Sequence, residues 1–88
     1  MLDGSEVLAT KLNITVREVD GDGVVYNENT GSLHLFNNSS FFIWRCLDGT
    51  TSLDEIAKEM ANHFSISELQ ARNDVLEFIE QLKDSELI

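Results

Sequence analysis

The sequence contains one cysteine, no proline and no long run of apolar residues. A single cysteine, Cys46, excludes an internal disulfide and any metal site built from several cysteines. No stretch approaches the roughly 18 apolar residues that a membrane span requires. The first residues read M-L-D-G-S-E and lack the basic start and apolar stretch of a secretion signal. We therefore expect a cytoplasmic protein.

Basic residues are also scarce, with six Lys and Arg against sixteen Asp and Glu, so the net charge is −10. The acidity is spread along the chain, because residues 1–37 hold two basic and six acidic residues and residues 38–88 hold four and ten. Such a charge repels nucleic acid and favours basic or neutral partners. The alternative is that the acidic residues serve solubility alone.

The first half of the chain has the pattern of short strands joined by tight turns. Residues 1–12 show no clear period and are expected to form a mobile arm or a loose first turn. Residues 14–19 alternate apolar and polar, and the Asp-Gly pairs of residues 20–23 suit a hairpin turn. A second strand over Val24–Tyr26, a turn over Asn27–Gly31 and a third strand over Ser32–Phe36 complete an antiparallel meander.

The second half has the pattern of helices. Residues 40–47 are apolar on nearly every side and predict the most buried helix, with Asn38, Ser39 or Ser40 as its cap and Gly49 after its end. The second helix begins with a Ser52–Glu55 capping box, and the third begins at Ser65 or Ser67. The apolar stripes of these two helices are Leu53, Ile56, Ala57, Met60 and Phe64, and then Leu69, Val75, Leu76, Phe78, Ile79 and Leu82. Leu87 and Ile88 are expected to pack back onto the domain.

Three strands followed by three helices in 88 residues predict a single domain over residues 1–88 of the α+β class. Its three-stranded antiparallel sheet should be covered by the helices on one face.

No catalytic or metal-binding pattern stands out. His34 and His63 are isolated, with no second ligand three or four residues away, and Cys46 lies in an apolar helix. Residues 20–23 resemble the start of a calcium loop but lack the oxygen ligand at its fifth position, so a hairpin turn is the better interpretation. We expect neither catalysis, nor a metal, nor a cofactor.

The strand Ser32–Phe36 carries neither a charge nor a proline, the usual devices that stop an edge strand from pairing with another chain. Leu33 and Leu35 share one face, and His34 and Phe36 share the other, which should meet the helices. The alternative is that Leu33 and Leu35 are covered by neighbouring strands or by the arm. An open edge would also allow a homodimer or a strand swap with a second copy.

The order and spacing of several short motifs over Val16–Ile88 resemble the PqqD-like family, the recognition elements of ribosomally made, modified peptides. The motifs are Thr30-Gly31, Phe36-Asn37, Ile43-Trp44, Leu47-Asp48-Gly49, the helix start Thr51–Ile56 and the run Asp74–Leu82. The sequence departs from the family at Leu33-His34, where aromatic residues are frequent, and at Ser85-Glu86-Leu87, where Gly-Leu is common.

The resemblance implies a winged helix-turn-helix-like fold and a role as a stand-alone peptide-binding module. The leader of a precursor peptide would add as a strand beside the third strand, facing the third helix, and pass to a separate radical SAM enzyme, cyclase or leader peptidase. On this basis the predicted peptide-binding residues are Leu33, His34, Leu35, Phe36, Leu69, Arg72, Leu76 and Ile79. Arg72 would pair with an acidic leader residue.

A winged-helix DNA-binding regulator has the same fold class and is the main alternative. The last helix argues against it, because residues 68–86 hold Arg72 and Lys83 against six acidic residues. We therefore expect no specific binding to duplex DNA. A small structural subunit of a larger enzyme is a third possibility that the sequence leaves open.

Overall fold

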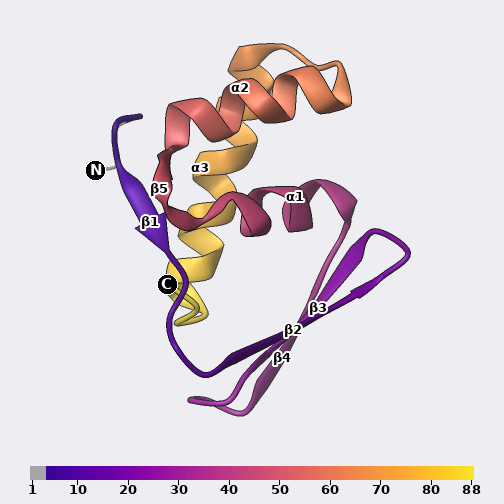
Figure 1. Ribbon diagram of the computed structural model, residues 1–88, viewed down its shortest axis with the longest axis vertical. Coiled ribbons are helices and arrows are strands. Elements are labelled where there is room, and N and C mark those ends of the chain that lie inside the picture. The colour runs from indigo at the N-terminus through magenta and orange to yellow at the C-terminus, as the bar shows by residue number, and fades with distance from the viewer. Residues whose placement is uncertain (1–3) are drawn as a thin grey trace.

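The computed structural model describes residues 4–88 as five strands and three helices, and it confirms the predicted α+β class. Figure 1 shows the three-stranded sheet at the bottom, α1 crossing above it, and α3 running from α2 down toward the sheet. In chain order the elements are β1 (Val7–Ala9), β2 (Ile14–Val19), β3 (Asp22–Asn27), β4 (Ser32–Phe36), α1 (Asn38–Cys46), β5 (Asp48–Ser52), α2 (Leu53–Phe64) and α3 (Glu68–Asp84).

The predicted meander forms an antiparallel sheet in the order β2-β3-β4. The two turns are made as the sequence indicates, since Asp20 and Gly21 have φ of 52° and 87° and Gly31 has φ of 76°. Glycine adopts these angles without steric cost. Gly23 has a different purpose, because the ring of Phe41 on α1 lies where its Cβ would be. That contact lets α1 pack closely on β3.

The N-terminal segment is paired with the rest of the chain over Val7–Ala9 and at Lys11, which corrects the prediction of a mobile arm for those residues. Residues 1–3 lie outside the described residues, but β1 pairs with β5 in a second, two-stranded antiparallel sheet. The backbone N–H of Lys11 also donates to the carbonyl of Leu87, at 3.0 Å. Neither contact could be read from the sequence, because a three-residue strand is too short to show a period and its partner lies some forty residues away.

The segment after α1 was predicted only to end the helix, and it also forms β5. Its first residue, Asp48, accepts hydrogen bonds at 2.9 Å from the backbone N–H groups of Thr50 and Thr51. These donors, with the N–H of Thr50 foremost, lower the pKa of Asp48 to about 2. The carboxylate therefore holds a tight turn through which the chain enters α2.

The helix starts follow the cap signals, with one correction. The Ser52–Glu55 capping box is present, and Ser67 caps α3 through the N–H of Gln70 at 3.1 Å. The cap of α1 is Asn37, one residue before the predicted positions, and its side chain accepts from Ser40 N at 2.9 Å. An Asn at the end of β4 can serve both elements because a cap residue keeps an extended backbone.

The core lies between the helices and the inner face of the sheet, with Val25, Phe41, Trp44, Ile56 and Phe78 among its buried members. Leu87 is fully buried and Ile88 packs against the core, as predicted. Leu69 was placed in the apolar stripe of α3 but is 71 % exposed. The buried stripe starts instead at Ala71 and continues through Val75, Phe78 and Leu82, and a residue two positions before Ala71 points away from it.

Asn27 joins the sheet to the end of α3. It is the one fully buried polar residue in the core of the described chain. Its Nδ2 donates to the carbonyl of Glu86 at 3.2 Å, and its Oδ1 accepts from the backbone N–H of Asn29 at 2.9 Å. This side chain therefore fixes how the end of α3 lies over the β3–β4 hairpin.

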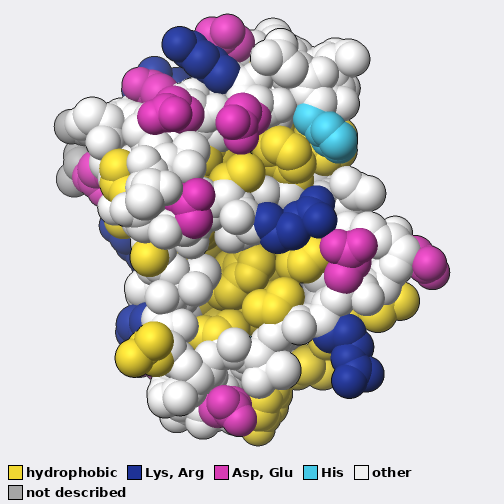
Figure 2. Space-filling model, in the orientation of Figure 1, with side chains coloured by type: hydrophobic (Ala, Val, Ile, Leu, Met, Phe, Trp, Pro, Cys, Tyr) yellow, Lys and Arg dark blue, Asp and Glu magenta, His cyan; other side chains and the backbone are white. Residues whose placement is uncertain are grey.

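Figure 2 shows apolar side chains gathered in the middle of one face, with Asp and Glu scattered around them. This agrees with the expectation that the acidity is distributed rather than confined to a tail. Within residues 4–88, no helix combines the length and apolar character needed to cross a membrane.

Candidate functional site

The strand β4 lies at one end of the three-stranded sheet and pairs only with β3. Along its other side, among the described residues, no strand pairs with it. Alternate backbone N–H and C=O groups of an edge strand point away from the sheet, so β4 offers them to an added strand. The predicted open edge is confirmed.

The side chains of β4 alternate as predicted. Leu33 and Leu35 point away from the helices and are 61 % and 77 % exposed, so no neighbouring segment of residues 4–88 covers them. His34 and Phe36 face the helices and are half-buried. The ring of Phe36 lies 5.0 Å from that of Phe78, edge to face. This contact fixes α3 against β4.

The helix α3 runs alongside β4 in the opposite direction. Phe78 meets Phe36 at one end of the strand. At the other end, Asn27 is the pairing partner of Ser32 and bonds the carbonyl of Glu86. The part of α3 that borders β4 is therefore its C-terminal half, from about Phe78 onward.

A polar hollow continues this border past the end of β4. It has a volume of about 200 Å³ and lies between the first turn of α1 and the middle of α3. Its walls carry two hydroxyls, two carboxyls and an amide, above nearly buried apolar side chains. The residues are Ser39, Ser40, Asp74, Glu77 and Gln81, with Ile43, Met60 and Phe78 beneath them.

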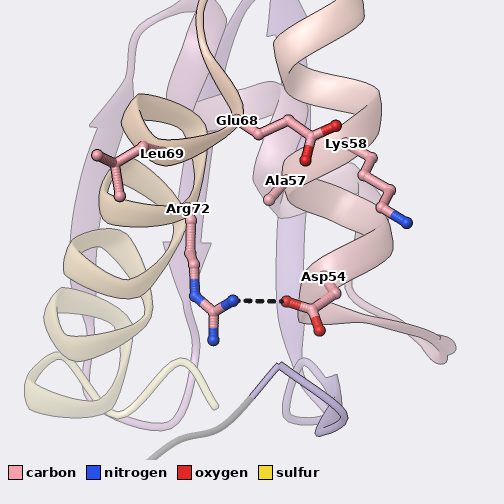
Figure 3. Close-up of a pocket in the computed structure, with 6 residues that line it drawn as sticks. All are labelled: Asp54, Ala57, Lys58, Glu68, Leu69 and Arg72. Carbon is pink, nitrogen blue, oxygen red and sulfur yellow. Dashed lines mark ion pairs between the residues drawn. The ribbon is translucent and has the colours of Figure 1, made fainter.

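Two of the α3 residues predicted to face a leader, Leu69 and Arg72, lie elsewhere. They line a pocket of about 420 Å³ between α2 and the start of α3, shown in Figure 3. There Arg72 reaches across to α2 and pairs with Asp54 at 3.3 Å. Leu69 is nine residues, or about 13 Å along the helix axis, from Phe78. The structure therefore separates these two residues from the edge of β4.

The other two α3 predictions are less accessible than expected. Ile79 is fully buried in the core, and Leu76 is half-buried against it. The four predicted residues do follow one another along α3, but Leu69 at the start of the series is exposed and Ile79 at its end is buried in the core. The face of α3 that borders β4 could have been found from Asp74, Glu77 and Gln81, which are spaced by three and four residues and so share one side of the helix. These residues were missed because the search followed apolar residues, and this series is polar.

The two histidines and the cysteine that the sequence singled out have different neighbours. His34 Nε2 lies 2.9 Å from the hydroxyl of Ser32, and His63 stacks on Phe42 with ring centroids 5.0 Å apart. Burial, with the nearby Glu59 carboxylate, raises the pKa of the Cys46 thiol. Among residues 4–88 no three His, Cys, Asp or Glu side chains are grouped as metal ligands would be.

The outer face of the sheet is apolar near β4. In the β3–β4 register, Leu33 lies opposite Tyr26 and Leu35 lies opposite Val24. A second hollow, of about 450 Å³, continues from Leu35 past Val24 to Val19 on β2. This surface was not predicted beyond Leu33 and Leu35, although the two turns that set the register are visible in the sequence.

Comparison with solved structures supports the fold. The chain resembles "TbiB1 in Complex with the TbiA(beta) Leader Peptide" with a TM-score of 0.83 and 19 % identity, over 91 % of this chain and 93 % of that one. It resembles "Lasso peptide synthetase B1 complexed with the leader peptide" with a TM-score of 0.74 and 19 % identity, over 89 % and 92 %. No curated protein matches the sequence.

The family model described as coenzyme PQQ synthesis protein D (PqqD) matches residues 22–88. This range begins with β3 and includes β4, the three helices and, apart from Val19, the residues that line the two hollows beside the open edge. The chain belongs to the PqqD family.

Proposed function

We propose that this chain is a stand-alone module, one domain over residues 1–88, that binds the leader of a ribosomally synthesised precursor peptide. The leader adds as a strand to β4, and the module presents the precursor to a separate modifying enzyme or leader peptidase. The observation that carries the proposal is the open, uncharged edge of β4 beside α3. Membership of the PqqD family and the likeness to two structures that hold a leader peptide support it.

The proposed contacts follow from strand addition, in which backbone hydrogen bonds supply affinity and side-chain pockets supply specificity. The backbone of Leu33 to Phe36 forms the ladder. The proposed wall is the C-terminal half of α3, with Phe78 at its base and Glu77 and Gln81 at its rim. Leu76 remains in the proposed site, while Arg72 and Leu69 would contact only a leader that extends to the start of α3.

The proposed role is recognition without catalysis, and the chemistry belongs to the partner enzyme. A DNA-binding role has no supporting observation. Six acidic residues in the last helix region oppose its two basic ones, and such a surface repels the phosphate backbone.

The test is a titration of isotopically labelled protein with the leader of the short precursor encoded beside its gene. Saturable binding with shifts concentrated on β4 and the second half of α3 is expected. Saturable binding with shifts confined to other elements would place the site elsewhere. The absence of binding to any leader encoded nearby would refute the proposed function.

A further inference from the structure

An added strand carries its side chains alternately on its two faces. Beside β4, these two faces meet different surroundings. The outward face continues the outer side of the sheet, and the inward face points toward α3. If the proposed function is right, each surface restricts the leader residues that it meets.

The outward surroundings are apolar. Side chains directly opposite on neighbouring strands have their Cβ atoms about 4.5–5.5 Å apart, so outward leader residues lie against Leu33 and Leu35. Both leucines are more than half exposed, and Val24 and Tyr26 extend the apolar surface across β3. The hollow of about 450 Å³ beside Leu35 gives room for a large side chain.

The inward surroundings past Phe36 are polar and acidic. The hollow of about 200 Å³ there is walled by Asp74 and Glu77, together with Gln81 and two serine hydroxyls of α1. Asp74 accepts a hydrogen bond from Gln70, while Glu77 makes neither an ion pair nor a hydrogen bond within the described part of the chain. An apolar side chain entering the hollow would remove water from these carboxylates without replacing its hydrogen bonds.

A cationic side chain does replace those hydrogen bonds, and bonds from Lys or Arg to carboxylates are among the stronger ones. Among residues 4–88, no Lys or Arg lines the hollow. The two arginines that form ion pairs, Arg45 and Arg72, are held by Glu18 and Asp54. The net charge of −10 adds a long-range attraction for a basic peptide.

We propose that this module recognises an alternating leader: apolar side chains facing outward onto Leu33 and Leu35, and a basic side chain on the opposite face that enters the hollow at Asp74 and Glu77. The basic residue is separated from the apolar ones by an odd number of positions, because only then do they lie on opposite faces of one strand.

The experiment is a selection from a library of displayed, fully randomised twelve-residue peptides on the immobilised full chain, followed by sequencing. The expected consensus has apolar residues at alternate positions and Lys or Arg at an odd spacing from them. Binding of the consensus peptide is then measured by calorimetry for the wild type and for two pairs of matched variants.

The first pair is Glu77→Lys and Glu80→Lys, which change the net charge equally at two exposed positions of α3, of which only Glu77 lines the hollow. We expect Glu77→Lys to weaken binding about fivefold or more, and Glu80→Lys less than twofold. The second pair is Leu35→Ser and Leu12→Ser, both at exposed leucines, of which Leu12 lies before β2 and lines neither hollow. Only Leu35→Ser should weaken binding, and selection on it should no longer favour apolar residues at the outward positions.

Three results separate the failure of this inference from that of the proposed function. Enriched peptides that bind β4 but show no alternation, or no basic residue, would overturn the inference and leave the function standing. Equal effects of Glu77→Lys and Glu80→Lys would do the same. No enriched peptide at all, from a library that yields binders for a known peptide-binding control, would overturn both.

Discussion

Replacing Asn27 with alanine tests the contact that fixes the end of α3 against the β3–β4 hairpin. The Asn27 side chain is fully buried and bonds two backbone groups, the carbonyl of Glu86 at 3.2 Å and the N–H of Asn29 at 2.9 Å. Alanine removes both bonds and leaves a small cavity. The carbonyl and the N–H then lose their partners at partly buried positions.

The expected loss of stability can be estimated from these two bonds. A buried polar group left without a partner costs about 1–3 kcal/mol. Both bonds are only partly buried, so we take the middle of that range for each, or less, and expect a total of about 3 kcal/mol. A domain of this size is stable by roughly 5–15 kcal/mol. At about 4–8 °C per kcal/mol, the unfolding temperature should fall by roughly 10–25 °C.

Thermal unfolding followed by circular dichroism measures the effect, with Asn29→Ala as the control. The Asn29 side chain also makes two hydrogen bonds, to Leu12 and Asn13, but both are exposed, and water replaces them when they are lost. Asn29→Ala should cost less than about 1 kcal/mol. Equal losses for the two variants would refute the view that Asn27 joins the sheet to α3.

Three further predictions concern β4, the turn after α1 and the end of α3. Only alternate N–H groups of β4 face the open edge, so proline at either Leu35 or His34 should remove an N–H that the leader needs. Of Leu35→Pro and His34→Pro, we therefore expect one to stay folded by circular dichroism and to lose leader binding by calorimetry. If both variants fold and bind normally, the leader does not pair with β4. The pKa of Asp48 is lowered from 3.8 to about 2, chiefly by the N–H of Thr50, so its carboxylate stabilises the fold above pH 4 and this contribution is lost as the pH falls toward 2; the difference in unfolding temperature between the wild type and Asp48→Asn should shrink from pH 5 to pH 2, and a constant difference would contradict this. Glu86 has φ of 59°, an angle that costs a non-glycine residue about 1 kcal/mol, so Glu86→Gly should raise the free energy of unfolding, measured by urea titration, by about that amount. A lower free energy of unfolding would mean that contacts of the Glu86 side chain outweigh the strain of its backbone angle.

The sequence predicts the meander, the three helices and the open strand well, because each depends on signals within a few residues. The Asp-Gly turn, the Ser52–Glu55 capping box and the uncharged Ser32–Phe36 segment are such local signals. The backbone angle of Glu86 shows the consequence of one departure from the family pattern, at Ser85-Glu86-Leu87. Where Gly is common, this chain has a residue that must adopt an angle that glycine adopts freely.

The sequence does not predict contacts between distant segments or the direction in which each helix face points. The pairing of β1 with β5 and the bond from Lys11 to Leu87 depend on the finished fold. The side of α3 that borders β4 is set by Phe36 packing on Phe78. Apolar spacing indicated Leu69 and Ile79, whereas the bordering surface is polar.

The contacts that complete the fold join residues far apart in the chain, and this sets an order of events during synthesis. Lys11 bonds Leu87, and Asn27 bonds Glu86, so neither contact can form until α3 has left the ribosome. The residues of the meander are synthesised well before then, when the helices that cover its inner face are not yet made. Such intermediates expose strand edges that invite pairing with other nascent chains. The high negative charge carried throughout the chain keeps neighbouring copies apart during that interval, before any leader can shield the edge.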